Sequence, residues 1–199
     1  MPAPIVLASG SGIRAQLLRN AGVPFSIDVA RVDEEPLKSA LLADGAKPRD
    51  IADALAEAKA RCISTRHPGV LVIGCDQLLE FEAQLMSKPE SPDMALTQLR
   101  NLRGRRHRLL SAAVVCRDGQ PLWRHVGQVR LHMRAVTDGY LEGYVARNWD
   151  SIRHAVGAYK LEEEGVRLFS AVEGDYFHVL GMPLLELLGF LMQQRVIEQ

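Results

Sequence analysis

Several charged side chains in this sequence have the types and surroundings that acid–base and phosphate chemistry require. Asp76 ends the apolar run 70–75, where a carboxylate can act as a general base or ligate a hard cation. Glu34 stands in an acidic triplet, and positive charge comes from Lys59, Lys88 and Arg14. Carboxylates bind Mg²⁺ or Mn²⁺ while cations neutralise the remaining phosphate charge, so this set predicts a metal–polyphosphate site.

Each of these residues also has an ordinary structural interpretation. Asp76 can be a strand acid that makes local hydrogen bonds, and Glu34 can be part of a solvated loop. Single lysines are in most cases solvated surface residues, which applies to Lys59 and to Lys88. Gln77 can read a base edge or satisfy backbone groups, and both alternatives stay open.

A glycine-rich loop, Ser9-Gly10-Ser11-Gly12, follows the first apolar run. Gly10-x-Gly12-x-x-Ala15 fits the dinucleotide-binding fingerprint, and Asp28 is near enough to serve as the ribose-binding acid. A turn between a strand and a helix can equally hold another phosphate, or no ligand at all. Arg14, one step into the helix, favours a phosphate over a dinucleotide because a guanidinium can clamp it with two hydrogen bonds.

Composition restricts the function classes. The 199 residues carry 24 Lys and Arg against 24 Asp and Glu, and a net charge of zero argues against bulk binding to nucleic acid or to anionic membranes. No apolar stretch reaches the length of a bilayer, and no signal peptide is evident. The 3 cysteines lack CxxC spacing, which is typical of reduced thiols in the cytoplasm.

The order of the expected elements indicates an α/β fold. Strands are expected over 4–9, 25–30, 69–81, 107–117 and 121–133, the last two joined by a hairpin at Asp118-Gly119. Helices are expected over 13–21, 49–65, 92–102, 138–147 and 181–194. A loop is expected over 32–40 because Pro36 disfavours a helix there, and two short strand-like pieces are expected before the last helix. Alternating elements with one long antiparallel hairpin predict a mixed sheet.

Eight segments, taken in order, resemble the Maf/septum-formation family over residues 5–192. They are "LASGSGIRAQLLRNAGVPF", "VDE", "LAEAKA", "VIGCDQ", "SKP", "LRGRRHRLLSAAVV", "VGAYKLEEEG" and "GDYFHVLGMPL". The resemblance implies a single domain over 1–199 with two lobes, in which helices flank an elongated mixed sheet around a central cleft, as in ITPase-like folds. It also implies a cytoplasmic, metal-dependent nucleoside triphosphate pyrophosphatase, which cuts the α–β bond to give a nucleoside monophosphate and pyrophosphate and removes unwanted nucleotides.

The same resemblance implies a role for each matching residue. Asp76 is implied to be the general base and a metal ligand, and Glu34 to hold the metal or orient the water. The residues implied to hold the triphosphate are Lys59, Lys88, Arg14, Ser9 and Ser11.

Substrate preference is implied by three positions, Ile13, Gln77 and Glu162. The family loop is Ser-Pro-Arg-Arg, so Gly12 and Ile13 replace the proline and the first arginine. This departure resembles the branch that acts on 7-methyl-GTP rather than on dTTP or UTP, and a glutamate suits the hydrogen-bond donors of guanine. A nucleotide-binding regulator with weak turnover is the alternative, and a dinucleotide oxidoreductase is the third. The expected partner is a small nucleotide, with a homodimer left open.

Overall fold

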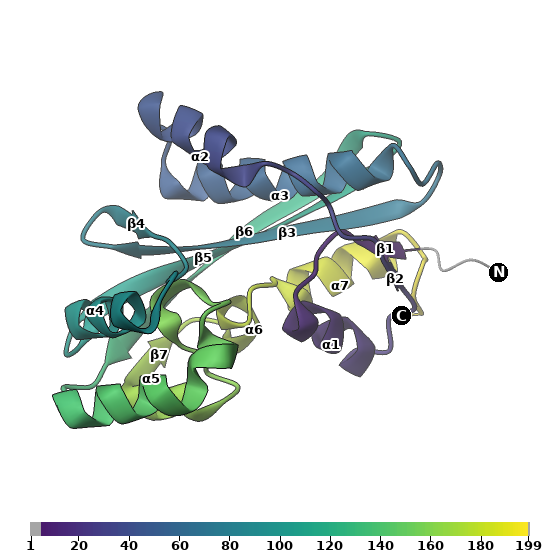
Figure 1. Cartoon of the computed structure of the whole chain (residues 1–199). Helices are drawn as coiled ribbons and strands as arrows, with labels where there is room; N and C mark the ends of the chain where they lie inside the picture. The colour runs from purple at the N-terminus through teal and green to yellow at the C-terminus, as the bar shows by residue number, and fades with distance from the viewer. Residues whose placement is uncertain (1–4, 199) are drawn as a thin grey trace. The chain divides into compact units, whose positions relative to one another are not determined.

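The computed structural model describes residues 5–198, which form a mixed α/β protein (Figure 1). Its strands are β1 (Ile5–Leu7), β2 (Ser26–Ile27), β3 (Leu71–Phe81), β4 (Gln84–Met86), β5 (Arg106–Arg117), β6 (Gln120–Met133) and β7 (Phe169–Glu173). Its helices are α1 (Gly12–Asn20), α2 (Glu34–Ala43), α3 (Pro48–Ser64), α4 (Pro92–Leu102), α5 (Asp138–Ile152), α6 (Tyr176–Val179) and α7 (Leu184–Gln193), with short 3₁₀ turns η1 (Val156–Ala158) and η2 (Glu164–Leu168). None of the helices within residues 5–198 is long and apolar enough to span a bilayer.

One mixed sheet takes in the seven strands of the described residues, in the order β2-β1-β3-β5-β6-β7, with β4 paired to β3. Strand β1 pairs in parallel with both β2 and β3, whereas β4 pairs antiparallel with β3 and β7 pairs antiparallel with β6. The expected mixed α/β fold is therefore confirmed. The hairpin between β5 and β6 turns at Asp118 and Gly119, whose φ angles of 50° and 76° are those of a tight hairpin turn.

Side chains and a glycine mark the ends of three helices. The hydroxyl groups of Ser91 and Thr137 accept hydrogen bonds from the backbone N–H groups of Met94 and Tyr140, and so begin α4 and α5. Gly22, with φ of 69°, follows the end of α1 in a conformation that glycine adopts without strain.

Three local predictions are wrong. Residues 32–40 are not a loop, because Pro36 falls in the first turn of α2, where its missing N–H has no helical partner to lose. The strand expected over 25–30 is reduced to Ser26 and Ile27, the residues of that segment whose Cα positions pair with β1. Only one strand, β7, forms where two pieces were expected, since the preceding residues fold into η1 and η2.

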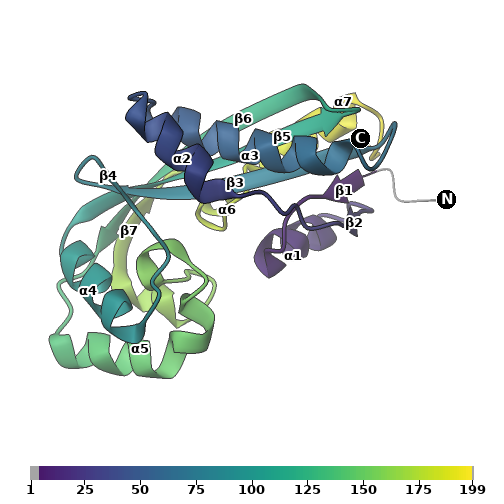
Figure 2. The same ribbon diagram turned by 45° about the horizontal axis from the view of Figure 1, so that its top comes forward.

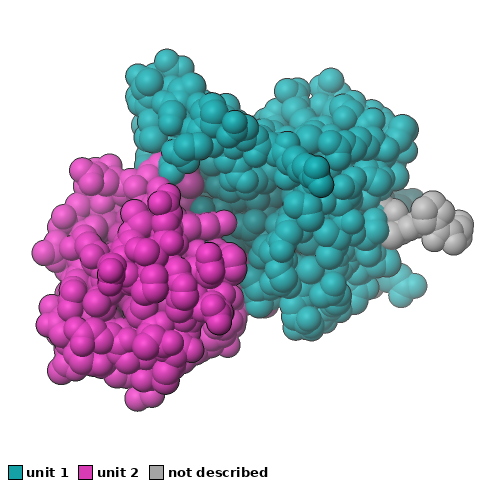
Figure 3. Space-filling model, viewed as in Figure 1, with its two compact units in different colours: residues 1–77, 110–127, 181–199 teal, residues 78–109, 128–180 magenta. Residues whose placement is uncertain are grey.

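The chain divides into two compact units (Figure 3). Unit 1 contains residues 1–77, 110–127 and 181–199, and unit 2 contains residues 78–109 and 128–180. In unit 1, α3 runs along β3 and α2 lies beside α3 (Figures 1 and 2). Val6, Ala8, Ile63 and Val72 form a buried cluster where β1, β3 and α3 pack together.

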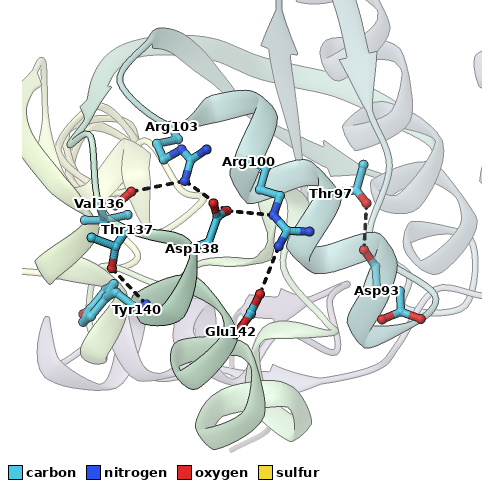
Figure 4. A network of polar contacts seen from close by, with 9 residues as sticks. All are labelled: Asp93, Thr97, Arg100, Arg103, Val136, Thr137, Asp138, Tyr140 and Glu142. Atoms are coloured by element: carbon cyan, nitrogen blue, oxygen red, sulfur yellow. Dashed lines mark hydrogen bonds and ion pairs between the residues drawn. The ribbon is translucent and has the colours of Figure 1, made fainter.

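Unit 2 has its own apolar core, to which α4, α5 and strand residues such as Leu79 and Leu131 contribute. Outside this core, two arginines tie the end of α4 to the start of α5 (Figure 4). Arg100 donates to Asp138 at 3.0 Å and to Glu142 at 3.1 Å, and Arg103 donates to Asp138 at 3.1 Å. These pairs are exposed, so each contributes little to stability on its own.

A buried histidine lies inside unit 2. The Nε2 atom of His107 is 2.8 Å from the hydroxyl oxygen of Tyr159, and the imidazole ring also contacts Phe169. Burial, together with the nearby His132, lowers the pKa of His107 from 6.5 to about 4. The side chain is therefore neutral in the folded protein at physiological pH.

We expect His107 to make the folded state sensitive to mild acid. The folded pKa is about 4 and lies below the unfolded value of 6.5, so between these values the unfolded chain binds more protons. The stabilising contribution is complete above pH 6.5 and is lost as the pH falls toward 4, which amounts to about 2.5 kcal/mol between pH 7.5 and 4.5. Urea unfolding at the two pH values measures this difference. His107→Gln is the control, and an equal pH dependence in that variant would contradict the assignment.

Candidate functional site

The glycine-rich loop between β1 and α1 leaves backbone N–H groups free at the start of a helix. The hydroxyl of Ser11 caps α1 by accepting from the N–H of Arg14, and the hydroxyl of buried Ser9 accepts from the N–H of Ser11 at 3.2 Å. Within residues 5–198 the N–H groups of Gly12 and Ile13 have no hydrogen-bond partner. Free N–H groups at a helix N-terminus suit a phosphate.

Gly12 is the first residue of α1, and a side chain there would meet nothing within 4 Å. Its backbone does not have a positive φ angle. Neither space nor conformation therefore requires glycine, and the position is the helical N1 site that proline favours. The loop keeps its form without the family's proline because Ser11 still caps the helix.

Arg14 reaches from α1 to two backbone carbonyls. Its Nε donates to the carbonyl of Gly181 at 2.8 Å, and its Nη1 donates to the carbonyl of Cys75 at 3.1 Å and to Ser9 Oγ at 3.3 Å. Cys75 directly precedes Asp76, so the guanidinium is tied to the strand that carries the predicted base. Its Nη2 makes no hydrogen bond to the part of the chain that the structure describes.

An acid–lysine cluster of Glu34, Lys59 and Asp76 forms next. Lys59 Nζ is 2.6 Å from Asp76 Oδ1 and 3.0 Å from Glu34 Oε2, which brings together residues from α3, β3 and α2. The Lys59 and Asp76 side chains are 12% and 9% exposed, whereas that of Glu34 is 48% exposed. The ion pair between Lys59 and Asp76 is therefore strongly shielded from solvent and the one with Glu34 is not.

Burial raises the pKa of Asp76 above its ordinary value of 3.8, although the neighbouring Lys59 and Arg14 cations act in the opposite direction. A carboxylate with a raised pKa accepts a proton more readily, as a general base must. Burial also raises the pKa of the adjacent Cys75 thiol, which keeps it protonated. Of these two neighbours, only Asp76 is suited to take a proton from water.

Gly74 allows α3 to approach β3 closely enough to form this cluster. A Cβ atom at position 74 would lie 2.2 Å from the carbonyl oxygen of Ala56 and 2.6 Å from the backbone nitrogen of Ala60. Side chains two residues apart in a strand share one face, so Asp76 faces the same helix as Gly74. Lys59, in the contacting turn of α3, therefore meets Asp76.

The strand expected over 69–81 is confirmed, and the end of the apolar run before Asp76 is not the end of that strand. Strand β3 continues to Phe81, and Asp76 lies inside it. The carboxylate pairs with Lys59 from within the strand and does not lie at a strand terminus. The apolar run stops at residue 75, but the glutamine and the acids beyond it remain in the strand.

The three predicted specificity positions have different surroundings. Ile13 is half-buried in the first turn of α1. Gln77 donates through Nε2 to the hydroxyl of Ser111 on β5, at 3.0 Å. Glu162 belongs to unit 2, where it is exposed in the turn before η2.

The remaining predicted phosphate ligand, Lys88, also belongs to unit 2 and is exposed in the loop between β4 and α4. Asp28, the ribose acid of the dinucleotide hypothesis, instead meets Nε2 of His67 at 2.9 Å. No local sequence pattern indicates the contact of the Gly181 carbonyl with Arg14. For Gly74, the sequence signal is a glycine within an apolar strand.

Comparison with known proteins identifies the family. Residues 4–194 match the family described as "Maf-like protein". A nucleoside triphosphate pyrophosphatase of Ruegeria pomeroyi is 69% identical over 198 residues, and one of Ruegeria sp. (strain TM1040) is 64% identical over 199, each alignment covering 100% of both chains. A 7-methyl-GTP pyrophosphatase of Brucella abortus is 42% identical over 198 residues, again 100% of both. These names confirm that the chain is an enzyme, and the resemblance seen in the motifs is confirmed as well: the chain belongs to the Maf family.

Proposed function

We propose that this chain hydrolyses nucleoside triphosphates between the α- and β-phosphates, giving a nucleoside monophosphate and pyrophosphate, and does so in the cytoplasm to remove unwanted nucleotides. The observation that carries the proposal is the shielded pair of Lys59 and Asp76, in the same unit as the Ser9–Arg14 loop. The names of the Ruegeria relatives support this reaction.

In the proposed mechanism Asp76 acts as the general base. Its carboxylate takes a proton from water and the water oxygen bonds to the α-phosphorus. The bond from the α-phosphorus to the oxygen that bridges the α- and β-phosphates breaks. The bridging oxygen leaves with the pyrophosphate. Lys59 holds the Asp76 carboxylate in place before the reaction and neutralises negative charge as it builds up.

The triphosphate is proposed to bind the loop between β1 and α1. Ser9 and Ser11 supply hydroxyl groups, the start of α1 supplies free N–H groups, and Arg14 supplies Nη2. Charge-assisted hydrogen bonds from guanidinium to phosphate are strong because both partners are charged. Lys88 stays a prediction from the family motif.

A divalent cation fits the donor set of the acid–lysine cluster. Glu34 and Asp76 both direct carboxylate oxygens at one cation, Lys59 Nζ, and carboxylates are the ligands that Mg²⁺ and Mn²⁺ prefer. We propose that these two residues hold the metal. When bound, Mg²⁺ or Mn²⁺ would neutralise phosphate charge.

For the substrate we propose a modified purine nucleotide such as 7-methyl-GTP. Ile13 replaces the arginine expected in the pyrimidine branch, Gln77 stands at a position where that branch has threonine, and a carboxylate such as that of Glu162 can accept hydrogen bonds from guanine. The relative named for 7-methyl-GTP is 42% identical, whereas the more similar Ruegeria proteins carry the general name. The preference therefore rests mainly on these three residues.

A substrate panel tests the proposal. Purified protein with Mn²⁺ or Mg²⁺ is incubated with 7-methyl-GTP, GTP, dTTP and UTP, and products are separated by anion-exchange chromatography. Monophosphate with pyrophosphate is expected, fastest from 7-methyl-GTP. Diphosphate with inorganic phosphate would contradict the cleavage position, and faster turnover of dTTP or UTP would contradict the role of Ile13. Metal-dependent binding without products would favour the nucleotide-binding regulator.

A further inference from the structure

The guanidinium of Arg14 is held from one side by the protein itself. The Gly181 carbonyl accepts a hydrogen bond from Nε at 2.8 Å. The Cys75 carbonyl and the Ser9 hydroxyl accept hydrogen bonds from Nη1, at 3.1 and 3.3 Å. All four residues belong to unit 1. Three acceptors on three segments of the chain fix the plane of the guanidinium before any ligand binds.

Gly181 lies against this group in a conformation that only glycine adopts readily. Its φ angle is 89°, and a Cβ atom added to it would lie 3.1 Å from both Nε and Nη2 of Arg14. Such a contact is tighter than nearly all real Cβ contacts, so with an alanine there the guanidinium would have to shift by a few tenths of an ångström. The residue therefore provides an acceptor and also the space that the guanidinium occupies.

The restraint leaves Nη2 as the free donor on the guanidinium, within the described part of the chain. A long arginine side chain normally loses much rotational freedom when it binds a ligand. A guanidinium already fixed by carbonyl groups loses less, and preorganisation of this kind increases affinity.

We propose that Gly181 is a positioning residue for substrate binding: its carbonyl and its missing side chain fix Arg14 so that Nη2 is presented to the triphosphate. The inference rests on the proposed function, in which Arg14 binds phosphate. Gly181 itself touches no substrate in this arrangement, and its effect passes through Arg14.

The test compares Gly181→Ala with Gly22→Ala. Gly22 has a similar φ of 69°, but a Cβ there meets nothing within 4 Å, so the control shares the backbone strain and lacks the contact with Arg14. G181A is expected to raise KM for the nucleoside triphosphate, and the inhibition constant of pyrophosphate, by about 10- to 100-fold, the effect of losing one charge-assisted hydrogen bond. G22A is expected to change neither, while both variants melt at a similarly reduced temperature. Equal KM values for G181A and G22A would overturn the proposal.

A double-mutant cycle separates a role through Arg14 from a merely structural one. In an Arg14→Ala background, Gly181→Ala should cost nothing further in KM, because the group that it displaces is gone. Full additivity would overturn the proposal.

Arg14→Lys provides a test that leaves the Gly181 backbone unstrained. Lysine keeps the charge but cannot bind two carbonyls and a phosphate with one planar group. The KM of R14K should therefore rise nearly as much as that of R14A. Wild-type KM in R14K would contradict the inference. If wild-type protein fails to hydrolyse any triphosphate, the proposed function fails instead. If R14A is impaired while G181A matches G22A, the function stands and only the role of Gly181 is lost.

Discussion

Asp76→Asn is expected to lower kcat by about a thousandfold, the middle of the range for removal of a general base. Asparagine has a similar size and keeps a polar group beside Lys59, but it cannot take a proton from water. Steady-state assays of pyrophosphate release, with the melting temperature as a check on folding, measure the effect. Asp28→Asn is the matched control in the same unit, since Asp28 pairs with His67 rather than with Lys59. Turnover unchanged in D76N would contradict the assigned mechanism.

The pH profile of kcat should identify the same group independently. Burial raises the pKa of Asp76 whereas a bound divalent cation would lower it, so the wild-type rate is expected to fall on acidification as Asp76 is protonated, at a pH that depends on the metal. The residual activity of D76N should lack this acid limb, whereas D28N should retain it. An acid limb that persists unchanged in D76N would assign the titrating group to another residue.

Gly74→Ala is expected to lower the free energy of unfolding by about 3 kcal/mol, the upper end of the usual cost of overpacking. The added methyl group would lie 2.2 Å from the Ala56 carbonyl oxygen, which is backbone, so the whole helix must move rather than a side chain. Because Lys59 lies on that helix, kcat should fall in the folded variant as well. Urea denaturation and assays at low temperature measure the two effects.

Gly189→Ala provides the control for Gly74→Ala. Gly189 lies within α7, and a side chain there would meet nothing within 4 Å. Alanine has a higher helix propensity than glycine, so the free energy of unfolding of this variant should rise by up to about 1 kcal/mol and its activity should be unchanged. If the free energy of unfolding of G74A differs from the wild-type value by no more than that of G189A, the approach of α3 to β3 is not tight.

Local rules predicted the elements whose signals are local. Ser91 and Thr137 each begin a helix as their side chains indicate, and Asp118-Gly119 turns the hairpin. The prediction of a loop around Pro36 was wrong because a proline in the first turn of a helix removes no helical hydrogen bond. Whether Pro36 lies in the first turn depends on where the helix begins, which the proline itself does not indicate.

The structure brings together some of the residues that the motifs indicate, but their contacts could not be read from the sequence. The pairing of Lys59 with Glu34 and Asp76 agrees with the residue set taken from the motifs. The contact between Arg14 and Gly181 spans 167 positions in the sequence, and no local pattern indicates it. The close approach at Gly74 depends on how tightly a helix packs on a strand, which residue spacing does not report.

The position of Gly181 in the sequence determines when its hydrogen bond to Arg14 can form during synthesis. Unit 1 draws on residues 1–77, 110–127 and 181–199, whereas all residues of unit 2 lie between 78 and 180. A chain emerging from the ribosome therefore completes the sequence of unit 2 while Arg14 still lacks its 2.8 Å acceptor. The nascent protein cannot fix the Arg14 guanidinium through this hydrogen bond until residue 181 has been made, so premature termination before Gly181 yields a product without this contact.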